Sequence, residues 1–371
     1  MTRQQMGADL WSAYTELRNA QSRYDNPFFD PEFAAIMSEV RDDTRFGIAF
    51  QGEDVVGVWP LHLRPGCWAR PIGGPFSDVN GPILKQGINL AEEAFLAGLG
   101  LAGLTSAGLL PQKTGRARPE LEREGLHLSD LSGGWEAFMA GQQKAWPKHF
   151  KKMRRLYRNV DRDFSESRFE WDETSDACFE TLINLKRRQF DRTGLHDVLK
   201  PAWAQSFLDR LRQHESDRMR LRMVALRFDD RIAAIEVNLQ SDRVLHGWLT
   251  AFDPELSNYS PGNMLVQEML QHMPQGDLSL YDAGIGLSHY KRHYCNLQQP
   301  LDVGTVRADV AAASPMRWAG QLWRLGERSM PGRLGNAMTR VRRRMDQIAS
   351  SELTTGRRVA GLASALNRRN V

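Results

Sequence analysis

Cysteine is scarce in this chain: among 371 residues, the only cysteines are Cys67, Cys178 and Cys295. They are far apart and odd in number, and none lies in a C-x-x-C pair or in a cysteine–histidine cluster with metal-ligand spacing. Neither a disulfide framework nor a zinc site is therefore expected, and a reducing, cytoplasmic setting is the one that fits.

Long apolar runs are lacking as well. The first 17 residues interleave Arg3, Asp9 and Glu16 with apolar side chains, which excludes the apolar core of a signal peptide. The uncharged stretch 94–110 contains four glycines and falls just short of a membrane-spanning length. We expect a buried helix that leads into a strand at this place, and a protein without a membrane span.

The composition is that of an ordinary globular protein, with 41% hydrophobic and 25% charged residues. A chain of 371 residues is longer than one hydrophobic core usually supports, so at least two domains are expected. The charges are divided unevenly. Residues 306–371 hold 13 arginines, no lysine and four acidic residues, whereas the rest of the chain holds 36 basic and 41 acidic residues. An acidic body with a basic tail indicates a polyanionic partner for the tail.

Hydrophobic periodicity and turn residues predict the elements of the first half. Two helices are expected near 9–20 and 31–40, followed by a hairpin over 45–63. A further helix is expected from about residue 90, a strand near 107–110, and one basic helix or a pair of helices over 144–162.

The second half is predicted more clearly. Helices are expected over 179–193 and after Pro201, and then three strands over 221–228, 232–240 and 244–252. The short turns between these strands require an antiparallel meander. A loop over 258–263, a helix over 264–272 and a strand over 278–285 follow. This order of elements resembles the core of GNAT acetyltransferases, and the first half shows a less distinct version of the same order.

Strand alternation selects two candidate general bases. Side chains along a strand point to opposite faces in turn, so Glu236 and Asn238 are expected on one face of their strand. In the next strand His246, Trp248 and Thr250 are expected to share a face, opposite the apolar Leu245, Leu249 and Ala251. We therefore predict a sheet with helices on one face and a substrate on the other, where Glu236 or His246 deprotonates an attacking amine. The alternative is a partly solvated sheet with polar residues outward.

The loop before the helix over 264–272 is a candidate pyrophosphate site, because backbone N–H groups at a helix N-terminus attract anions. The candidate binding residues are Tyr259, Ser260, Gly262, Asn263 and Met264. In GNAT enzymes coenzyme A docks at this place through an Arg/Gln-x-x-Gly-x-Gly/Ala pattern, of which only the central glycine, Gly262, is present in this chain. The alternative is a plain helix start.

The most specific string is Leu280-Tyr-Asp-Ala-Gly-Ile-Gly-Leu-Ser-His-Tyr-Lys-Arg292. It resembles the Asp-Phe-Gly-x-Gly-x-x-x-Tyr-Lys signature of CelD-type and FemAB-like acyltransferases of the GNAT superfamily. Two other strings agree with that resemblance, Asn26-Pro-Phe-Phe-Asp-Pro-Glu-Phe33 and Phe76-Ser-Asp-Val-Asn-Gly-Pro82. Carried over to this sequence, the resemblance places Asp282, Tyr290 and Lys291 near the active cleft. The alternative is an Asp282–Lys291 pair with a structural role.

The resemblance implies N-acylation of an amino sugar during synthesis of an exopolysaccharide or adhesin. Acetyl-CoA is the expected co-substrate, and the expected acceptor is a nucleotide-linked or lipid-linked amino sugar. The amine would attack the thioester directly, so no covalent enzyme intermediate is required. Lys291 and Arg292 would neutralise a substrate phosphate, and Tyr290 or Tyr294 would protonate the departing thiolate.

The tail is amphipathic and rich in arginine. Its residues Arg342, Arg343, Arg344 and Asp346 include the Arg-x-x-Asp spacing seen at cyclic di-GMP sites. A regulatory nucleotide site is one hypothesis, docking on an anionic membrane surface is a second, and packing against the body is a third. DNA and RNA are not expected partners. The protein is expected in the cytoplasm, with possible docking at the inner membrane through the tail.

The sequence as a whole predicts an α/β (α+β) fold of tandem GNAT-like domains, each a mixed, mainly antiparallel sheet flanked by helices, plus a helical C-terminal tail. The predicted boundaries are 1–165, 166–305 and 306–371. Two other functions stay open: a FemAB-type transferase that uses aminoacyl-tRNA, and a non-catalytic GNAT scaffold that binds a messenger.

Overall fold

The computed structural model of the chain describes residues 1–112, 118, 121–273, 278–286, 290–308, 345, 347–354, 356–358 and 361. Its strands are β1 (Thr44–Gln51), β2 (Asp54–Arg64), β3 (Trp68–Pro71), β4 (Ile83–Leu84), β5 (Gly103–Leu109), β6 (Glu122–Asp130), β7 (Ser167–Glu170), β8 (Met219–Phe228), β9 (Arg231–Ser241), β10 (Val244–Phe252), β11 (Leu280–Ile285) and β12 (Leu297–Arg307). Its helices are α1 (Ala8–Asn19), α2 (Pro31–Val40), α3 (Glu92–Gly98), α4 (Trp135–Ala145), α5 (Pro147–Asp163), α6 (Asp176–Thr193), α7 (Ala202–Gln213), α8 (Pro261–His272) and α9 (Lys291–Tyr294). Short 3₁₀ turns occupy Arg3–Gln5, Ser22–Tyr24, Pro27–Phe29 and Pro254–Tyr259.

All the strands join one mixed sheet, in the order β1-β2-β3-β5-β12-β6-β11-β10-β9-β8-β7, with β4 paired to β2. Most neighbours are antiparallel, and the parallel pairs are β3 with β5 and β10 with β11. The predicted fold class, a mixed and mainly antiparallel sheet flanked by helices, is confirmed. The two halves of the chain are not separate sheets, because β12 returns from the C-terminal side and pairs with both β5 and β6.

Local signals explain the element ends that the sequence predicted well. Helix α2 begins at Pro31, where the Asp30 side chain accepts a hydrogen bond from the Glu32 N–H at 2.9 Å. Helix α6 ends at Gly194, whose φ of 65° is the left-handed conformation that closes many helices. The predicted meander is present as β8, β9 and β10, joined by tight turns at Asp229 and Asp242.

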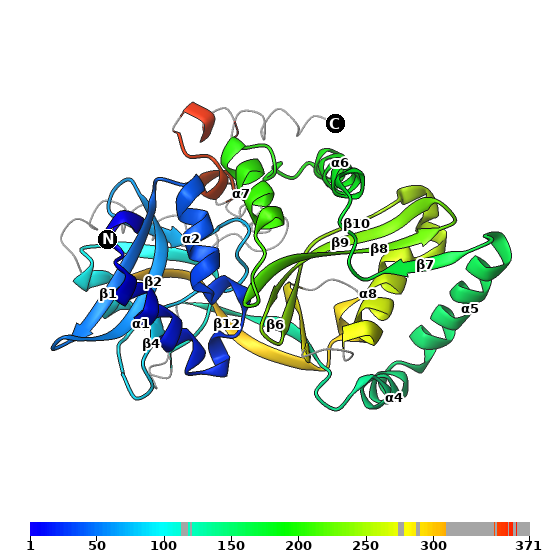
Figure 1. The fold of residues 1–371 in the computed structure, drawn as a ribbon, viewed down its shortest axis with the longest axis horizontal. Coiled ribbons are helices and arrows are strands. Elements are labelled where there is room, and N and C mark those ends of the chain that lie inside the picture. Colours follow the sequence, from blue (N-terminus) through cyan, green and yellow to red (C-terminus); the bar gives the residue numbers. More distant parts are fainter. Residues whose placement is uncertain are drawn as a thin grey trace, which may run out of the picture.

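Helices cover both faces of the second half of the sheet (Figure 1). Helix α8 packs on β8, β9 and β10 from one side, while α6 and α7 pack on the same strands from the other. The largest apolar cluster passes between the halves, because Phe33 and Phe46 belong to it together with Phe207 and Val237. A second cluster joins α5 and α8 to the opposite face of β8 to β11. Helix α5 therefore packs with the second half of the chain, and the predicted boundary near residue 165 stays a prediction.

The predicted faces of β10 were wrong. The register between β10 and β9 shifts between Gly247 and Leu249, so residues before and after this bulge alternate out of phase. Leu245 consequently lies in the cluster with α8, whereas Leu249 and Ala251 lie in the cluster on the other face. The predicted polar face is not exposed to solvent along these strands, because Glu236, Asn238 and His246 are all at most 1% exposed.

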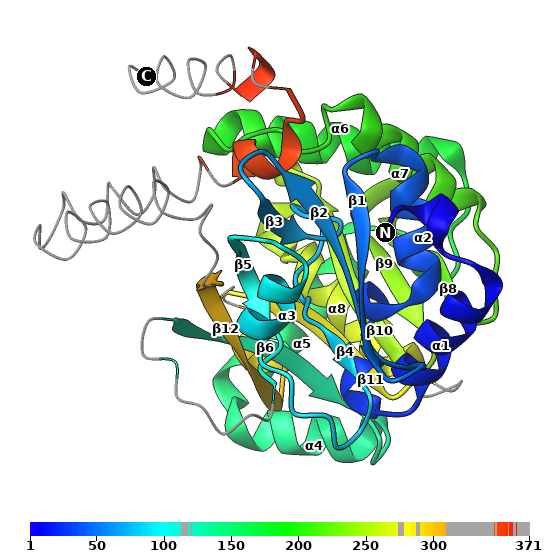
Figure 2. The same ribbon diagram turned by 90° about the vertical axis from the view of Figure 1, so that its left-hand side faces the viewer.

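A short part of the tail docks on the body, beside α7 (Figure 1) and near the ends of β2 and β3 (Figure 2). Arg64 donates to the carbonyls of Ala349 and Glu352 at 2.6 and 2.9 Å, and Trp203 Nε1 donates to that of Ser351 at 2.8 Å. Arg64 comes from the first half and Trp203 from the second, so this segment joins both. Among the described residues, no helix is long and apolar enough to cross a bilayer.

Candidate active site

The candidate site lies where two parallel strands separate. The described pairing between β10 and β11 runs from Val244 with Leu280 to His246 with Asp282 and then stops. Strand β10 continues along β9 to Phe252, while β11 continues beside β6. Beyond His246 the edge of β10 is therefore not paired with β11, and we call the place where the two strands part the strand opening.

A buried histidine–carboxylate pair marks this point. The Nδ1 atom of His246 lies 2.8 Å from Oδ2 of Asp282, and the two side chains are 1% and 0% exposed. Asp282 also accepts hydrogen bonds from Asn26 Nδ2 at 2.6 Å and from the Gly284 N–H at 2.8 Å. An ionised carboxylate only accepts hydrogen bonds, so Nδ1 of His246 carries the proton. In neutral His246 the lone pair is then on Nε2.

The Nε2 atom of His246 is buried and has no hydrogen-bond partner among the described residues. Asp78 Oδ2, from the first half of the chain, lies 3.9 Å away. Phe28 packs against the imidazole with its ring edge, at a centroid distance of 4.7 Å. The site thus presents one lone pair of a buried base beside a second carboxylate, which is an arrangement suited to accepting a proton.

Two glycines let Asp78 come this close. Gly284 has a φ of 79°, and a Cβ at this position would lie 2.4 Å from Asp78 Oδ2. A Cβ at Gly108 would overlap the backbone oxygen of Asp78. The glycine of the Asp-x-Gly motif at 282–284 is therefore needed for both its backbone conformation and its lack of a side chain.

The charges of the site shift one another's pKa values. Burial favours neutral His246, but the carboxylates of Asp282 and Asp78 outweigh burial and raise the pKa of His246 above 6.5. Burial raises the pKa of Asp78, against the opposing effect of His246. Burial lowers the pKa of Lys291, against the opposing effect of Asp78 and Asp282. The two carboxylates therefore favour the imidazolium, the form in which His246 would hold a proton taken from a substrate.

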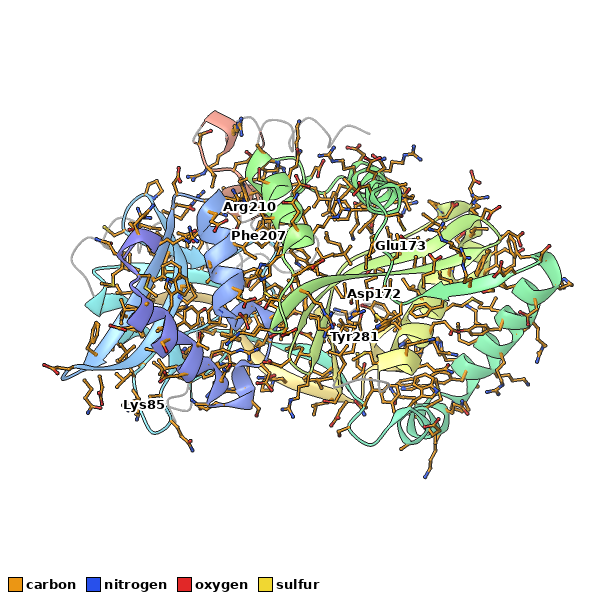
Figure 3. The ribbon with its side chains drawn as sticks, viewed as in Figure 1. Lys85, Asp172, Glu173, Phe207, Arg210 and Tyr281 are labelled. Atoms are coloured by element: carbon orange, nitrogen blue, oxygen red, sulfur yellow. The ribbon has the colours of Figure 1, made fainter. Side chains whose placement is uncertain are left out.

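Glu236 belongs to a separate network on the other face of the sheet. Its Oε1 accepts a hydrogen bond from Tyr281 at 3.0 Å and its Oε2 accepts one from Thr250 at 2.5 Å. Tyr281 lies near the centre of the molecule (Figure 3), and it also hydrogen-bonds Tyr290. Burial raises the pKa of Glu236, although the hydrogen bonds from Thr250 and Tyr281 oppose this shift. Because both oxygens of Glu236 are engaged, His246 is the better placed base.

Asn238, beside this network, has unused hydrogen-bonding capacity. Its side chain is fully buried, and neither its Oδ1 nor its Nδ2 has a partner among the described residues. It pairs across the sheet with Gly247, where a Cβ would lie 2.3 Å from the Tyr281 hydroxyl and 2.8 Å from Glu236 Oε1. A buried amide without partners at the strand opening is a candidate contact for a ligand that carries amides.

The other predicted catalytic residues lie near the pair, with different roles from those expected. Lys291 is 5% exposed and donates to the Ile285 carbonyl at 2.6 Å, so it holds the end of β11. Burial raises the pKa of Tyr290 and of Tyr294, which keeps both phenols protonated and able to donate. The structure thus brings His246, Asp282 and Lys291 into one region, whereas Tyr290 packs with Tyr281 in the cluster on the face of the sheet that holds Glu236.

The predicted pyrophosphate loop is largely occupied by its own contacts. The N–H groups of Asn263 and Met264 both donate to the Ser260 carbonyl, and the Met264 side chain is buried. The Tyr259 hydroxyl donates to Asp163 at 3.0 Å. Ser260 has a φ of 55°, the left-handed conformation, and its N–H donates to the Ser257 carbonyl at 3.0 Å. Binding of coenzyme A by these five residues stays a prediction.

The predicted nucleotide site of the tail cannot be placed, because Arg342, Arg343, Arg344 and Asp346 lie outside the described residues. In the described part of the chain, no group of three or more His, Cys, Asp or Glu side chains could hold a metal ion.

Sequence reasoning missed Asn26, Asp78 and Tyr281 as site residues. Asn26 and Asp78 belong to the two N-terminal strings on which the resemblance partly rests, and Tyr281 lies inside the signature. The sequence signal that could have identified them was the resemblance of all three strings to the same family, which suggests that the strings meet at one site. In the structure Asn26 contacts Asp282 and Asp78 lies near His246, whereas Tyr281 binds Glu236 on the other face of the sheet.

Residues 147–292 match the family model of the acetyltransferase (GNAT) domain. The match begins at the first residue of α5 and ends at Arg292, the last residue of the signature string, so it contains His246 and Asp282. The resemblance found in the sequence is thereby confirmed for this stretch at the level of the GNAT superfamily. The narrower CelD-type assignment stays a prediction.

Several solved structures are similar to the chain at low identity. The C-terminal domain of a putative lysylphosphatidylglycerol synthetase from Agrobacterium fabrum shares 14% identity over 85% of this chain and 96% of that one, with a TM-score of 0.47. FemX shares 8% identity over 74% of this chain and 90% of the FemX chain, with a TM-score of 0.48. A tandem GNAT protein from the clavulanic acid biosynthesis pathway shares 11% identity over 81% and 94%, with a TM-score of 0.43. Among curated proteins, none matches the sequence.

Proposed function

We propose that the protein is an N-acyltransferase in which His246, oriented by Asp282, deprotonates an amine that attacks an acyl-CoA thioester. The observation that carries the proposal is the unpartnered, buried Nε2 of His246 at the opening between β10 and β11. This opening lies within the stretch that matches the GNAT acetyltransferase domain.

The proposed step balances as a direct transfer. The amine nitrogen forms a bond to the acyl carbon, the carbon–sulfur bond breaks, and coenzyme A leaves as a thiolate. The proton from the amine goes to Nε2 of His246, and the carboxylate of Asp282 stabilises the imidazolium. Asp78, 3.9 Å from Nε2, would hold the positively charged amine before deprotonation. Tyr290 or another protonated phenol would give a proton to the thiolate, and the second proton that leaves the nitrogen as the tetrahedral intermediate collapses would restore the phenol.

The residues at the strand opening suit an acyl-CoA. The pantetheine arm of coenzyme A carries amide groups, and Asn238 offers a donor and an acceptor that have no partner among the described residues. The unpaired edge of β10 beyond His246 offers backbone N–H groups to polarise the thioester carbonyl. We propose acetyl-CoA as the donor and, from the sequence resemblance, an amino sugar as the acceptor.

The first test is turnover of acetyl-CoA. With purified full-length protein and a panel of free, nucleotide-linked and lipid-linked amino sugars, we expect release of free coenzyme A thiol with at least one amine. The same sugar already N-acetylated serves as the matched control and should release none, because it lacks the nucleophile. Equal thiol release with both sugars would mean hydrolysis and would contradict N-acyl transfer.

A further inference from the structure

Helix α5 carries a row of cations on its exposed side. Lys148, Lys151, Lys152, Arg155, Arg158 and Arg162 follow one another at spacings of three or four residues or as neighbours, so they share one face of the helix. We name these six residues the basic stripe. All six are exposed, and the helix of 17 residues extends for about 25 Å.

The basic stripe is not neutralised by the protein itself. Within the described part of the chain, its ion pairs are confined to Arg162, which binds Asp163. Some exposed arginines elsewhere on the surface do have acidic partners. Arg231, for example, forms ion pairs with Asp253 and Glu255. Five adjacent cations without acidic partners repel one another, and this repulsion is relieved when an anionic surface binds.

The opposite face of α5 is apolar and packs in the hydrophobic core. Phe150, Met153, Leu156 and Val160 are at most 3% exposed and pack in the cluster shared with α8. The helix therefore cannot turn its apolar face outward to insert into a membrane or to bind a partner helix. Only the charged side is available, and Figure 1 shows α5 at the end of the molecule farthest from the N-terminal half.

A partly exposed tryptophan lies at the start of the stripe. Trp146 is 37% exposed and directly precedes α5. Its ring contacts His293 of α9 edge-on at 5.1 Å, and the guanidinium of Arg292 lies 5.9 Å from it. Tryptophan at the border of a cationic surface is typical of contact with bilayer headgroups. Binding of single-stranded RNA would instead favour aromatic residues interleaved among the cations.

From these contacts we propose that the basic stripe and Trp146 dock the protein on an anionic lipid bilayer. The stripe lies flat against the headgroups, and its cations bind through the negative surface potential. The association is peripheral and weakens with salt, because these charges are exposed. It is independent of acyl transfer, so the two proposals can fail separately.

The test is co-sedimentation of the full-length protein with phosphatidylcholine vesicles that do or do not contain phosphatidylglycerol. We expect binding only to the anionic vesicles. In the variant Lys148→Gln/Lys151→Gln/Lys152→Gln/Arg155→Gln the partition coefficient should fall about tenfold or more. Glutamine keeps the helix propensity, and unchanged far-UV circular dichroism would verify folding.

The matched control removes four exposed cations elsewhere, as Lys85→Gln/Arg188→Gln/Arg192→Gln/Lys200→Gln. This control variant has the same net charge and the same tail as the stripe variant. We expect it to bind anionic vesicles nearly as well as the wild type. Equal losses in both variants would overturn the proposal, since net charge alone would then account for binding. Binding of a tRNA mixture but not of vesicles, lost in the stripe variant, would also overturn it and would identify an RNA-binding face.

Discussion

Replacement of His246 by glutamine is expected to lower kcat/KM for acyl transfer by about 10²–10⁴-fold. Glutamine can hydrogen-bond to Asp282 but cannot take a proton from the amine. Steady-state release of coenzyme A measures the effect, with Glu236→Gln as the comparison. Glu236 is engaged by Tyr281 and Thr250 and lies on the other face of the sheet. If Glu236→Gln abolished activity while His246→Gln retained it, the assignment of the base would be wrong.

The pH dependence of kcat/KM distinguishes a chemical role of Asp282 from a purely structural one. Neutral His246 is the active form, so kcat/KM should rise with pH through a pKa above 6.5 in the wild type. Asp282→Asn removes the carboxylate that most favours the imidazolium, so the rise should move to lower pH and the maximum rate should fall. A lower maximum with an unmoved pH profile would assign Asp282 a structural role only.

Arg18→Met is expected to cause the largest loss of stability, about 3–5 kcal/mol in the free energy of unfolding. Arg18 is 2% exposed and joins the halves of the chain. It binds Asp242, donates to Ser241 Oγ at 2.5 Å and to the Asp25 carbonyl at 3.1 Å, and lies 3.8 Å from Asp30, which is fully buried. Methionine has a similar length but removes these hydrogen bonds, and it leaves Asp30 with Arg218, at 3.4 Å, as its cationic partner.

Urea titration measures this loss, and Arg231→Met is the matched control. Arg231 also binds two acidic residues, Asp253 and Glu255, but its side chain is 47% exposed. Exposed ion pairs contribute little because water screens them, so the loss of stability in Arg231→Met should be much smaller than that in Arg18→Met. Similar losses in the two variants would contradict the view that burial makes Arg18 critical.

Much of the second half of the fold could be predicted from the sequence because its signals are local. Two short-range signals predict these elements. One is the apolar spacing of α6, α7 and the meander, and the other is the turn residues between the strands. The strand β12 was not predicted, since Pro300 and Gly304 argue against a strand in the sequence, although the structure pairs it with two neighbours. A single continuous sheet could not be inferred either, because pairing between distant segments has no local signature.

The site residues were predicted only in part, because local patterns select single residues but not the contacts between them. His246 and Asp282 were selected separately, one from strand alternation and the other from a motif, and their contact follows from the pairing of β10 with β11. The bulge at Gly247–Leu249 reversed the expected faces, because one extra residue in a strand changes the direction of every side chain after it. The contribution of Asp78 depends on a contact between positions 168 residues apart in the sequence.

Calorimetric titration of the full-length protein with acetyl-CoA tests the central claim most directly, because it requires no knowledge of the acceptor. We predict saturable binding at one site per chain, weakened by Asn238→Leu, which removes the unpartnered amide at the strand opening while leaving its volume filled. Adenosine diphosphate, which lacks the pantetheine arm, should bind the wild type and this variant equally or not at all. Absence of acetyl-CoA binding by folded wild-type protein would contradict the account.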